Sequence, residues 1–174
     1  MKWLLPVFGL CLLMAVLAAL IGALLPRVHA ASRVARFRAS PAELYAVARD
    51  FAAAPTWRSN VRSVELLARR DGRVHYRETT AHGAVTYAVL DDRPAERLVT
   101  EIVDPDLSYA GTWTFEFETA GANGGSRLRI TERGEVKNVI FRFLARFVFG
   151  HTTTMDTYLR DLGRRVGEEI APQP

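Results

Sequence analysis

The sequence predicts an α+β fold in which a curved antiparallel sheet wraps around a long C-terminal helix, with an apolar helix at the N-terminus. Two segments, residues 112–119 and 126–136, alternate strictly between apolar and polar side chains, which is typical of strands covered on one face only. Residues 138–166 then carry apolar side chains at helical spacing, with Asn138 placed to cap the helix. Because this helix follows the two strands directly, we expect it to cover their apolar face.

Size and composition indicate one globular domain with a short additional segment. The chain has 174 residues, 49% of them hydrophobic and 24% charged, which is enough to bury a sizeable core. Its formal net charge of +4 comes from arginines interspersed with acidic residues, and this pattern argues against nucleic acid as a partner. The single cysteine, Cys11, lies in the N-terminal apolar segment, so the rest of the sequence has no disulfide framework, thiolate metal site or cysteine nucleophile.

The apolar run at residues 3–25 predicts either a membrane anchor or a signal peptide. As a helix it is long enough to cross a hydrocarbon core about 30 Å thick, and it exceeds the roughly 7–15 residues of a usual signal-peptide core. The competing interpretation rests on residues 28–30 (Val-His-Ala), which fit a small-x-small cleavage site. We therefore divide the chain into an anchor or signal at 1–30 and a soluble domain at 31–174.

The charges around this segment do not agree on the side of the membrane that holds the domain. Arginines follow the apolar run from Arg27 onward, and charge counting alone would keep them in the cytoplasm. A signal-like start followed by a cleavage motif instead favours export. We expect a single-pass anchor with an exported domain. The alternatives are a secreted or periplasmic domain cleaved near Ala30, and a domain that faces the cytoplasm.

The soluble part begins with a predicted strand at residues 32–39, followed by a capped helix. Ser40 suits the N-cap, Pro41 suits the first helical position, and Glu43 completes a capping box. An Ala-Pro pair at 54–55 ends this helix, and a second short turn follows. Two short helices therefore separate the first strand from the rest of the sheet.

Four further strands are expected before the alternating pair, with turn residues between them. The pairs at 71–72 (Asp-Gly) and 82–83 (His-Gly) are hairpin turn signals. The four strands are expected at residues 61–68, 73–80, 84–90 and 97–103. Consecutive hairpins give an antiparallel meander, which must curve strongly if it is to wrap the final helix.

Several motifs along the chain resemble those of one superfamily. They are Ala-Ser-Pro-Ala-Glu-Leu-Tyr at 39–45, Asp-Phe at 50–51, Pro-x-Trp at 55–57, Val-x-x-Val at 61–64, Gly-Thr-Trp-Thr-Phe at 111–115, Ile-Thr-Glu-x-Gly-Glu-Val at 130–136 and Phe-Arg-Phe at 141–143. In this order the motifs resemble those of the SRPBCC superfamily, which includes START and birch-pollen-allergen-like proteins. The resemblance is to its polyketide cyclase/dehydrase and lipid-transport branch. The resemblance covers residues 33–169. The N-terminal apolar segment is a departure from the usual soluble, single-domain member.

The resemblance implies a helix-grip fold with a hydrophobic cavity between the sheet and the long helix. Members of the superfamily bind lipids, polyketides, sterols or hormones, and a minority catalyse cyclisation or dehydration. The candidate ligand-binding residues, most of them on predicted inward faces, are Trp57, Tyr76, Tyr87, Trp113, Phe115, Phe143, Phe147 and Met155. The same side chains would serve equally well as a solid, close-packed core.

Two carboxylates have the phase of inward-facing strand residues. Glu78 is in phase with Tyr76, and Glu132 is in phase with Ile130. A buried carboxyl group has its pKa raised by desolvation and can serve as a general acid or base, so both are catalytic candidates. The alternatives are contact with a polar group of the ligand, a bulge that turns the residue outward, or a structural pair with an arginine such as Arg77 or Arg129.

The remaining polar residues do not predict a metal or a cofactor. His75, His82 and His151 lack the spaced partners that would bring three ligands together. No nucleophile elbow, Ser-His-Asp pattern or Gly-rich phosphate loop is present. We therefore expect neither a metal nor a cofactor.

Three apolar residues lie off the inward stripe of the final helix. Phe141, Val148 and Phe149 would form a hydrophobic patch near the cavity entrance if they were exposed, and such patches mark contacts with a bilayer or a partner. The alternative is that the first helices of the domain cover them.

Three functions are compatible with these observations. The first is a membrane-associated or exported binding protein that holds a hydrophobic small molecule, such as a lipid or a polyketide, in its cavity. The second is a cyclase or dehydratase that uses an inward carboxylate as general acid or base. The third is a non-catalytic interaction module at the membrane with a vestigial cavity.

Overall fold

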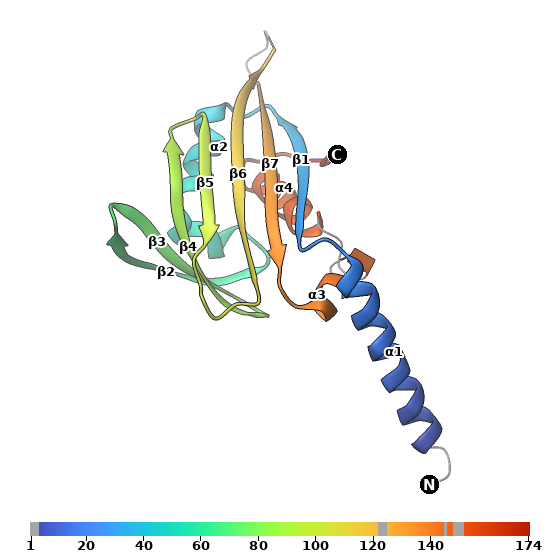
Figure 1. Ribbon diagram of the computed structural model, residues 1–174. Coiled ribbons are helices and arrows are strands. Elements are labelled where there is room, and N and C mark those ends of the chain that lie inside the picture. The colour runs from blue at the N-terminus through green and yellow to red at the C-terminus, as the bar shows by residue number, and fades with distance from the viewer. Residues whose placement is uncertain (1–3, 122–124, 145, 148–151) are drawn as a thin grey trace.

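A seven-stranded antiparallel sheet forms the centre of the domain, as the computed structural model shows (Figure 1). The structure describes residues 4–121, 125–144, 146–147 and 152–174. The strands are β1 (Val28–Phe37), β2 (Val61–Arg70), β3 (Arg73–Thr80), β4 (Gly83–Arg93), β5 (Arg97–Ile102), β6 (Tyr109–Ala120) and β7 (Gly125–Val136). Their order in the sheet is β1-β7-β6-β5-β4-β3-β2, so β2 to β7 form the expected meander and β1 adds to its far edge.

The helices lie in three places around this sheet. α2 (Pro41–Arg49) and the 3-10 helix η1 (Phe51–Thr56) join β1 to β2, α3 (Val139–Leu144) and α4 (Thr153–Arg165) follow β7, and α1 (Leu4–Leu24) precedes β1. The predicted capping box of α2 is confirmed: the Glu43 N–H donates to the Ser40 hydroxyl, and the Ser40 N–H donates to the Glu43 carboxylate at 2.8 Å.

The core lies between the sheet and α4. Met155, Leu159 and Leu162 on α4 are fully buried, and they belong to one apolar cluster with residues of β6 and β7 such as Phe117 and Leu128. The predicted fold class is therefore confirmed, with a C-terminal helix covering a curved antiparallel sheet (Figure 1).

The expected single helix over residues 138–166 is described as two helices with different partners. α4 packs in the core, whereas α3 packs beside α1. Gly22 of α1 lies so close to the Val139 backbone that a side chain there would collide with the Val139 carbonyl. The Arg142 guanidinium also donates a hydrogen bond to the Leu25 carbonyl at 2.9 Å. The apolar spacing is continuous along residues 138–166, but the first part of this segment, α3, packs beside α1.

The first strand begins at Val28, earlier than the expected residue 32. His29 pairs with Gly134 and Ala30 pairs with Arg133, both on β7. The segment 28–30, which resembles a signal-peptide cleavage site, is therefore part of the edge strand of the sheet.

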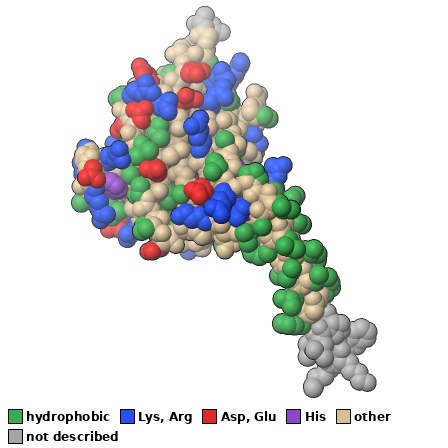
Figure 2. Space-filling view, in the orientation of Figure 1, with side chains coloured by type: hydrophobic (Ala, Val, Ile, Leu, Met, Phe, Trp, Pro, Cys, Tyr) green, Lys and Arg blue, Asp and Glu red, His purple; other side chains and the backbone are tan. Residues whose placement is uncertain are grey.

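α1 has the length and composition of a membrane anchor or of a signal sequence. Its span Val7–Leu24 is apolar and almost entirely exposed, and Figure 2 shows it as a nearly continuous apolar rod leaving a domain of mixed surface charge. It is the one helix of the described residues that is long and apolar enough to cross a membrane.

Candidate ligand-binding cavity

Part of the space between the sheet and α4 is hollow, next to the packed core. A cavity of about 640 Å³ extends between β3, β4, β6 and β7 on one side and the start of α4 on the other. Small-molecule sites in proteins usually measure about 300–1,000 Å³. The cavity therefore has the size of a ligand-binding site.

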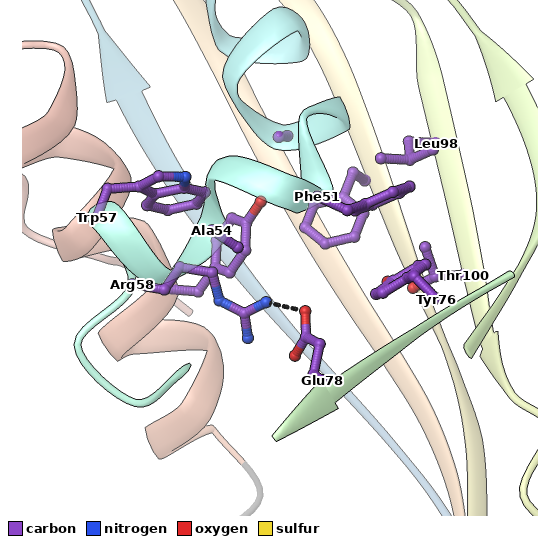
Figure 3. A pocket seen from close by; sticks show the side chains of 11 residues that line it. Phe51, Ala54, Trp57, Arg58, Tyr76, Glu78, Leu98 and Thr100 are labelled. Carbon is purple, nitrogen blue, oxygen red and sulfur yellow. Dashed lines mark hydrogen bonds and ion pairs between the residues drawn. The ribbon is translucent and has the colours of Figure 1, made fainter. Parts of the chain in front are cut away.

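A buried ion pair lies in the wall of this cavity. Arg58 follows η1 and Glu78 lies on β3, and the Arg58 guanidinium donates to the Glu78 carboxylate through Nη1 (Figure 3). The guanidinium also lies over the ring of Tyr158 on α4, at 5.2 Å from its centroid. Burial opposes the charge of Arg58, but the neighbouring Glu78 carboxylate raises its pKa, so that the guanidinium stays charged.

A small recess of about 20 Å³ shares Arg58, Glu78 and Tyr76 with this cavity and is shown in Figure 3. Phe51 stacks on Tyr76 at 4.0 Å between ring centroids, and Tyr76 stacks on Tyr87 at 5.2 Å, so one wall is aromatic. Two donors, Nε1 of Trp57 and Nε of Arg58, are buried and have no hydrogen-bond partner among the described residues. A polar group of a ligand at this end of the cavity would find donors that the protein itself leaves unused.

The tyrosine hydroxyls around the ion pair are held neutral. Burial raises the pKa of Tyr76, Tyr87 and Tyr158, and the Glu78 carboxylate raises each further. These three groups therefore remain protonated over the physiological range and can donate or accept hydrogen bonds.

A second polar pair lies near the end of the sheet where β1 begins. His29 Nε2 and the Glu132 carboxylate are 3.5 Å apart, and both residues line the cavity. The imidazole packs against Gly134, where a Cβ atom would collide with the ring. Burial lowers the pKa of His29, so the neutral imidazole is favoured at neutral pH.

The loop that carries Arg58 is fixed by a buried carboxylate on α4. Asp161 is only 1% exposed, and it accepts hydrogen bonds from the Ser59 N–H at 2.7 Å and the Ser59 hydroxyl at 2.8 Å. Its other oxygen accepts from Arg164. Asp161 is therefore a positioning residue, because it holds the chain next to Arg58 against α4.

We expect Asp161→Ala to lower the free energy of unfolding by about 2–3 kcal/mol, because the N–H and the hydroxyl of Ser59 lose a charged acceptor on α4. Asp161→Asn, which keeps an acceptor oxygen, should lose clearly less. Thermal unfolding of the full chain in detergent measures both variants. Equal losses in the two would show that the hydrogen bonds to Ser59 do not hold the loop.

Six of the eight predicted lining residues lie in the cavity, in the recess beside it or in the core. Tyr76, Tyr87, Trp113 and Phe115 line the large cavity, as expected for inward strand positions. Trp57 lines the small recess. Met155 is fully buried in the core.

Phe143 and Phe147 lie outside the cavity, contrary to the expectation that they line it. Their rings pack on each other at 5.1 Å between centroids, and Phe147 is 60% exposed. The reason is that α3, which carries Phe143 and precedes Phe147, packs mainly against α1. Val148, Phe149 and His151 lie outside the described residues.

Glu78 and Glu132 both line the cavity, as their phase predicts. Glu78 does pair with an arginine, but with Arg58, whereas Arg77 pairs with Glu65 and Arg129 pairs with Glu116. Sequence reasoning missed Arg58 and His29. Arg58 adjoins the Pro-x-Trp motif, but nothing in the spacing shows which way a loop side chain points.

A curved antiparallel sheet that closes over a C-terminal helix and encloses a ligand-sized cavity defines a START-like helix-grip domain. Residues 28–167 match the family described as "Polyketide cyclase / dehydrase and lipid transport", and the chain belongs to this family. The match begins at Val28, where β1 begins.

Solved structures share this fold at low sequence identity. A START superfamily protein from Mycobacterium smegmatis is 21% identical, with a TM-score of 0.63 over 79% of this chain and 97% of the other. The Zhui aromatase/cyclase from a Streptomyces species is 15% identical, with a TM-score of 0.61 over 81% and 99%. Norcoclaurine synthase from Thalictrum flavum is 11% identical, with a TM-score of 0.63 over 80% and 86%. A comparison with curated protein sequences gave no match.

Proposed function

We propose that this protein is a membrane-anchored binding protein for a hydrophobic small molecule that carries one polar group. The observation that supports the proposal best is the cavity of about 640 Å³ with the Arg58–Glu78 pair in its wall. Aromatic and aliphatic walls favour an apolar body, at about 25 cal/mol per Å² of buried apolar area. The unused donors of Arg58 and Trp57 favour a hydrogen-bond acceptor, such as a carbonyl or hydroxyl oxygen, at the inner end.

The size of the cavity speaks against a vestigial site. A module that only presents a surface needs no interior space, and empty space is costly because the atoms that line it lose packing contacts. The proposal therefore favours ligand binding over a purely structural role at the membrane.

The proposal is tested on the full chain extracted from membranes and purified in detergent. An organic extract of the protein is analysed by mass spectrometry, and the extract should contain a small molecule in near-stoichiometric amount from more than one expression host. Extracts that match those of an unrelated single-pass protein purified in the same detergent would overturn the proposal.

A second candidate function is catalysis of dehydration or cyclisation, which is favoured by the two carboxylates that face the cavity. Glu78→Gln and Glu132→Gln separate the two functions. An enzyme that removes water would accumulate an unreacted molecule in the impaired variant, heavier than the wild-type product by one water. A binding protein would carry the same molecule in both.

The position of residues 28–30 supports retention of α1 as an anchor. Cleavage after Ala30 would remove three residues of β1 that pair with β7, and it would remove His29 from the cavity wall. We therefore expect the intact mass of protein extracted from membranes to include α1. A mass that corresponds to a chain beginning at Ala31 would contradict this expectation.

A further inference from the structure

We infer that α3, Phe147 just after it and the adjoining end of α1 form an interfacial foot that places the cavity mouth on the surface of a lipid bilayer. The foot consists of Leu20, Ile21, Leu24, Ile140, Phe141 and Phe147. The inference rests on the proposed anchoring of α1 and adds the route of the ligand, which enters from the bilayer and not from water.

The first step is that α3 is attached to the end of α1. Gly22 admits the Val139 backbone at a distance that no side chain would allow. Arg142, although charged, is buried, and its guanidinium donates to the Leu25 carbonyl just beyond the last turn of α1. A cation is favoured at the C-terminal end of a helix, where carbonyls lack partners. α3 therefore lies at the level where α1 leaves the domain.

The second step is that apolar side chains are exposed on α3 and at Phe147, which follows it, and that α3 packs beside the apolar helix α1. Phe141 is 52% exposed and Phe147 60% exposed, and Ile140 is also exposed. Leu24, in the last turn of α1, is 88% exposed. The described residues leave more than half of Phe141 and of Phe147 uncovered. Aromatic side chains are enriched at the level of lipid headgroups, so a bilayer crossed by α1 would cover the foot.

The third step is the charge beside the foot. Arg27, Lys137 and Arg146 are exposed and lie next to it in the chain, and Figure 2 shows basic side chains on the domain beside the end of α1. Basic residues at this level interact with anionic lipid headgroups, and each contributes about 1 kcal/mol. The charges therefore favour a lipid surface over a purely apolar protein partner.

The fourth step is that the cavity reaches the same end of the sheet. Its lining includes His29 at the start of β1, Tyr109 at the start of β6 and Val136 at the end of β7. β1 is entered from α1 and β7 leads into α3, and the Val136 N–H donates to the Arg27 carbonyl at 2.9 Å. In Figure 1 this is the end of the sheet from which α1 departs. An apolar molecule could therefore pass from the bilayer to the cavity without crossing bulk water.

The test uses the full chain in vesicles of phosphatidylcholine and phosphatidylglycerol. Cys11 is replaced by serine, and an environment-sensitive fluorophore is attached at Phe141→Cys or, separately, at Phe147→Cys. The matched control is Glu118→Cys, which is exposed near the opposite end of β6. Lipids with a spin label high on the acyl chain are then added as quenchers.

Fluorescence at positions 141 and 147 should shift to the blue and be quenched by the spin-labelled lipid, and fluorescence at 118 should do neither. Equal, weak quenching at all three positions would overturn the foot. A blue shift without lipid quenching would also overturn it, because a second protein copy would then cover the patch. The measurement needs no bound ligand: an unquenched label on a protein that still carries a small molecule rejects the foot alone.

Discussion

Arg58→Met is expected to lower the free energy of unfolding by about 3 kcal/mol, because it leaves the Glu78 carboxylate buried without its partner. For a domain of this size the loss corresponds to a fall in melting temperature of roughly 10 °C. Near-UV circular dichroism of the full chain in detergent follows the transition. The control is Arg77→Met, whose pair with Glu65 is exposed, and which should change the melting temperature little.

The double variant Arg58→Met/Glu78→Gln separates the fold from the ligand. Removing both charges should restore most of the lost stability, because no unpaired charge remains in the wall. Both Arg58→Met and the double variant should nevertheless contain less of the co-purifying molecule than the wild type, because its polar group no longer has the guanidinium as a hydrogen-bond donor. A double variant as unstable as Arg58→Met would show that the isolated Glu78 charge is not the cause. Full ligand retention in the double variant would remove Arg58 from the binding site.

The strands were predictable because their signal is local. The alternation of Trp113, Phe115 and Phe117 places these residues on one face whatever the rest of the chain does, and the structure puts Phe115 and Phe117 in the core. The capping box at Ser40 and Glu43 is equally local. Such patterns need only the geometry of a strand or of a helix end.

The division between α3 and α4 was not predictable in the same way. Leu144 and Tyr158 fit one apolar stripe in the sequence, and periodicity cannot say which apolar surface each part of a stripe covers. The deciding contact, between Gly22 and Val139, joins residues that are far apart in the chain. Tertiary contacts routinely override the helix propensity of a segment, so they decide where each helix packs.

The ion pair shows the same limit at the site. The phase of Glu78 predicts an inward carboxylate, since strand positions alternate. Its partner Arg58 comes from a loop whose path is set by the hydrogen bonds of Ser59 to Asp161, a residue of α4. Periodicity does not describe such a loop. The sequence therefore predicts the Glu78 half of the ion pair but not the Arg58 half.

Val85→Trp is expected to deplete the co-purifying molecule by about tenfold or more, which corresponds to about 1.4 kcal/mol of binding free energy. Val85 lines the cavity from β4 and lies opposite Glu78 on β3. An indole at this position would occupy space that the ligand needs. Because no protein side chain fills that space and aromatic residues suit strands, the variant should still fold. Mass spectrometry of the organic extract measures the depletion.

The matched control for Val85→Trp is Thr86→Trp on the same strand. Successive strand residues face opposite sides of the sheet, and Thr86 does not line the cavity. Both variants add an indole to β4, so any general effect on expression or strand pairing is common to them. Depletion by Val85→Trp alone would therefore report the loss of cavity volume. Equal depletion by both, or full retention in a folded Val85→Trp, would show that the ligand does not occupy the space between β4 and α4.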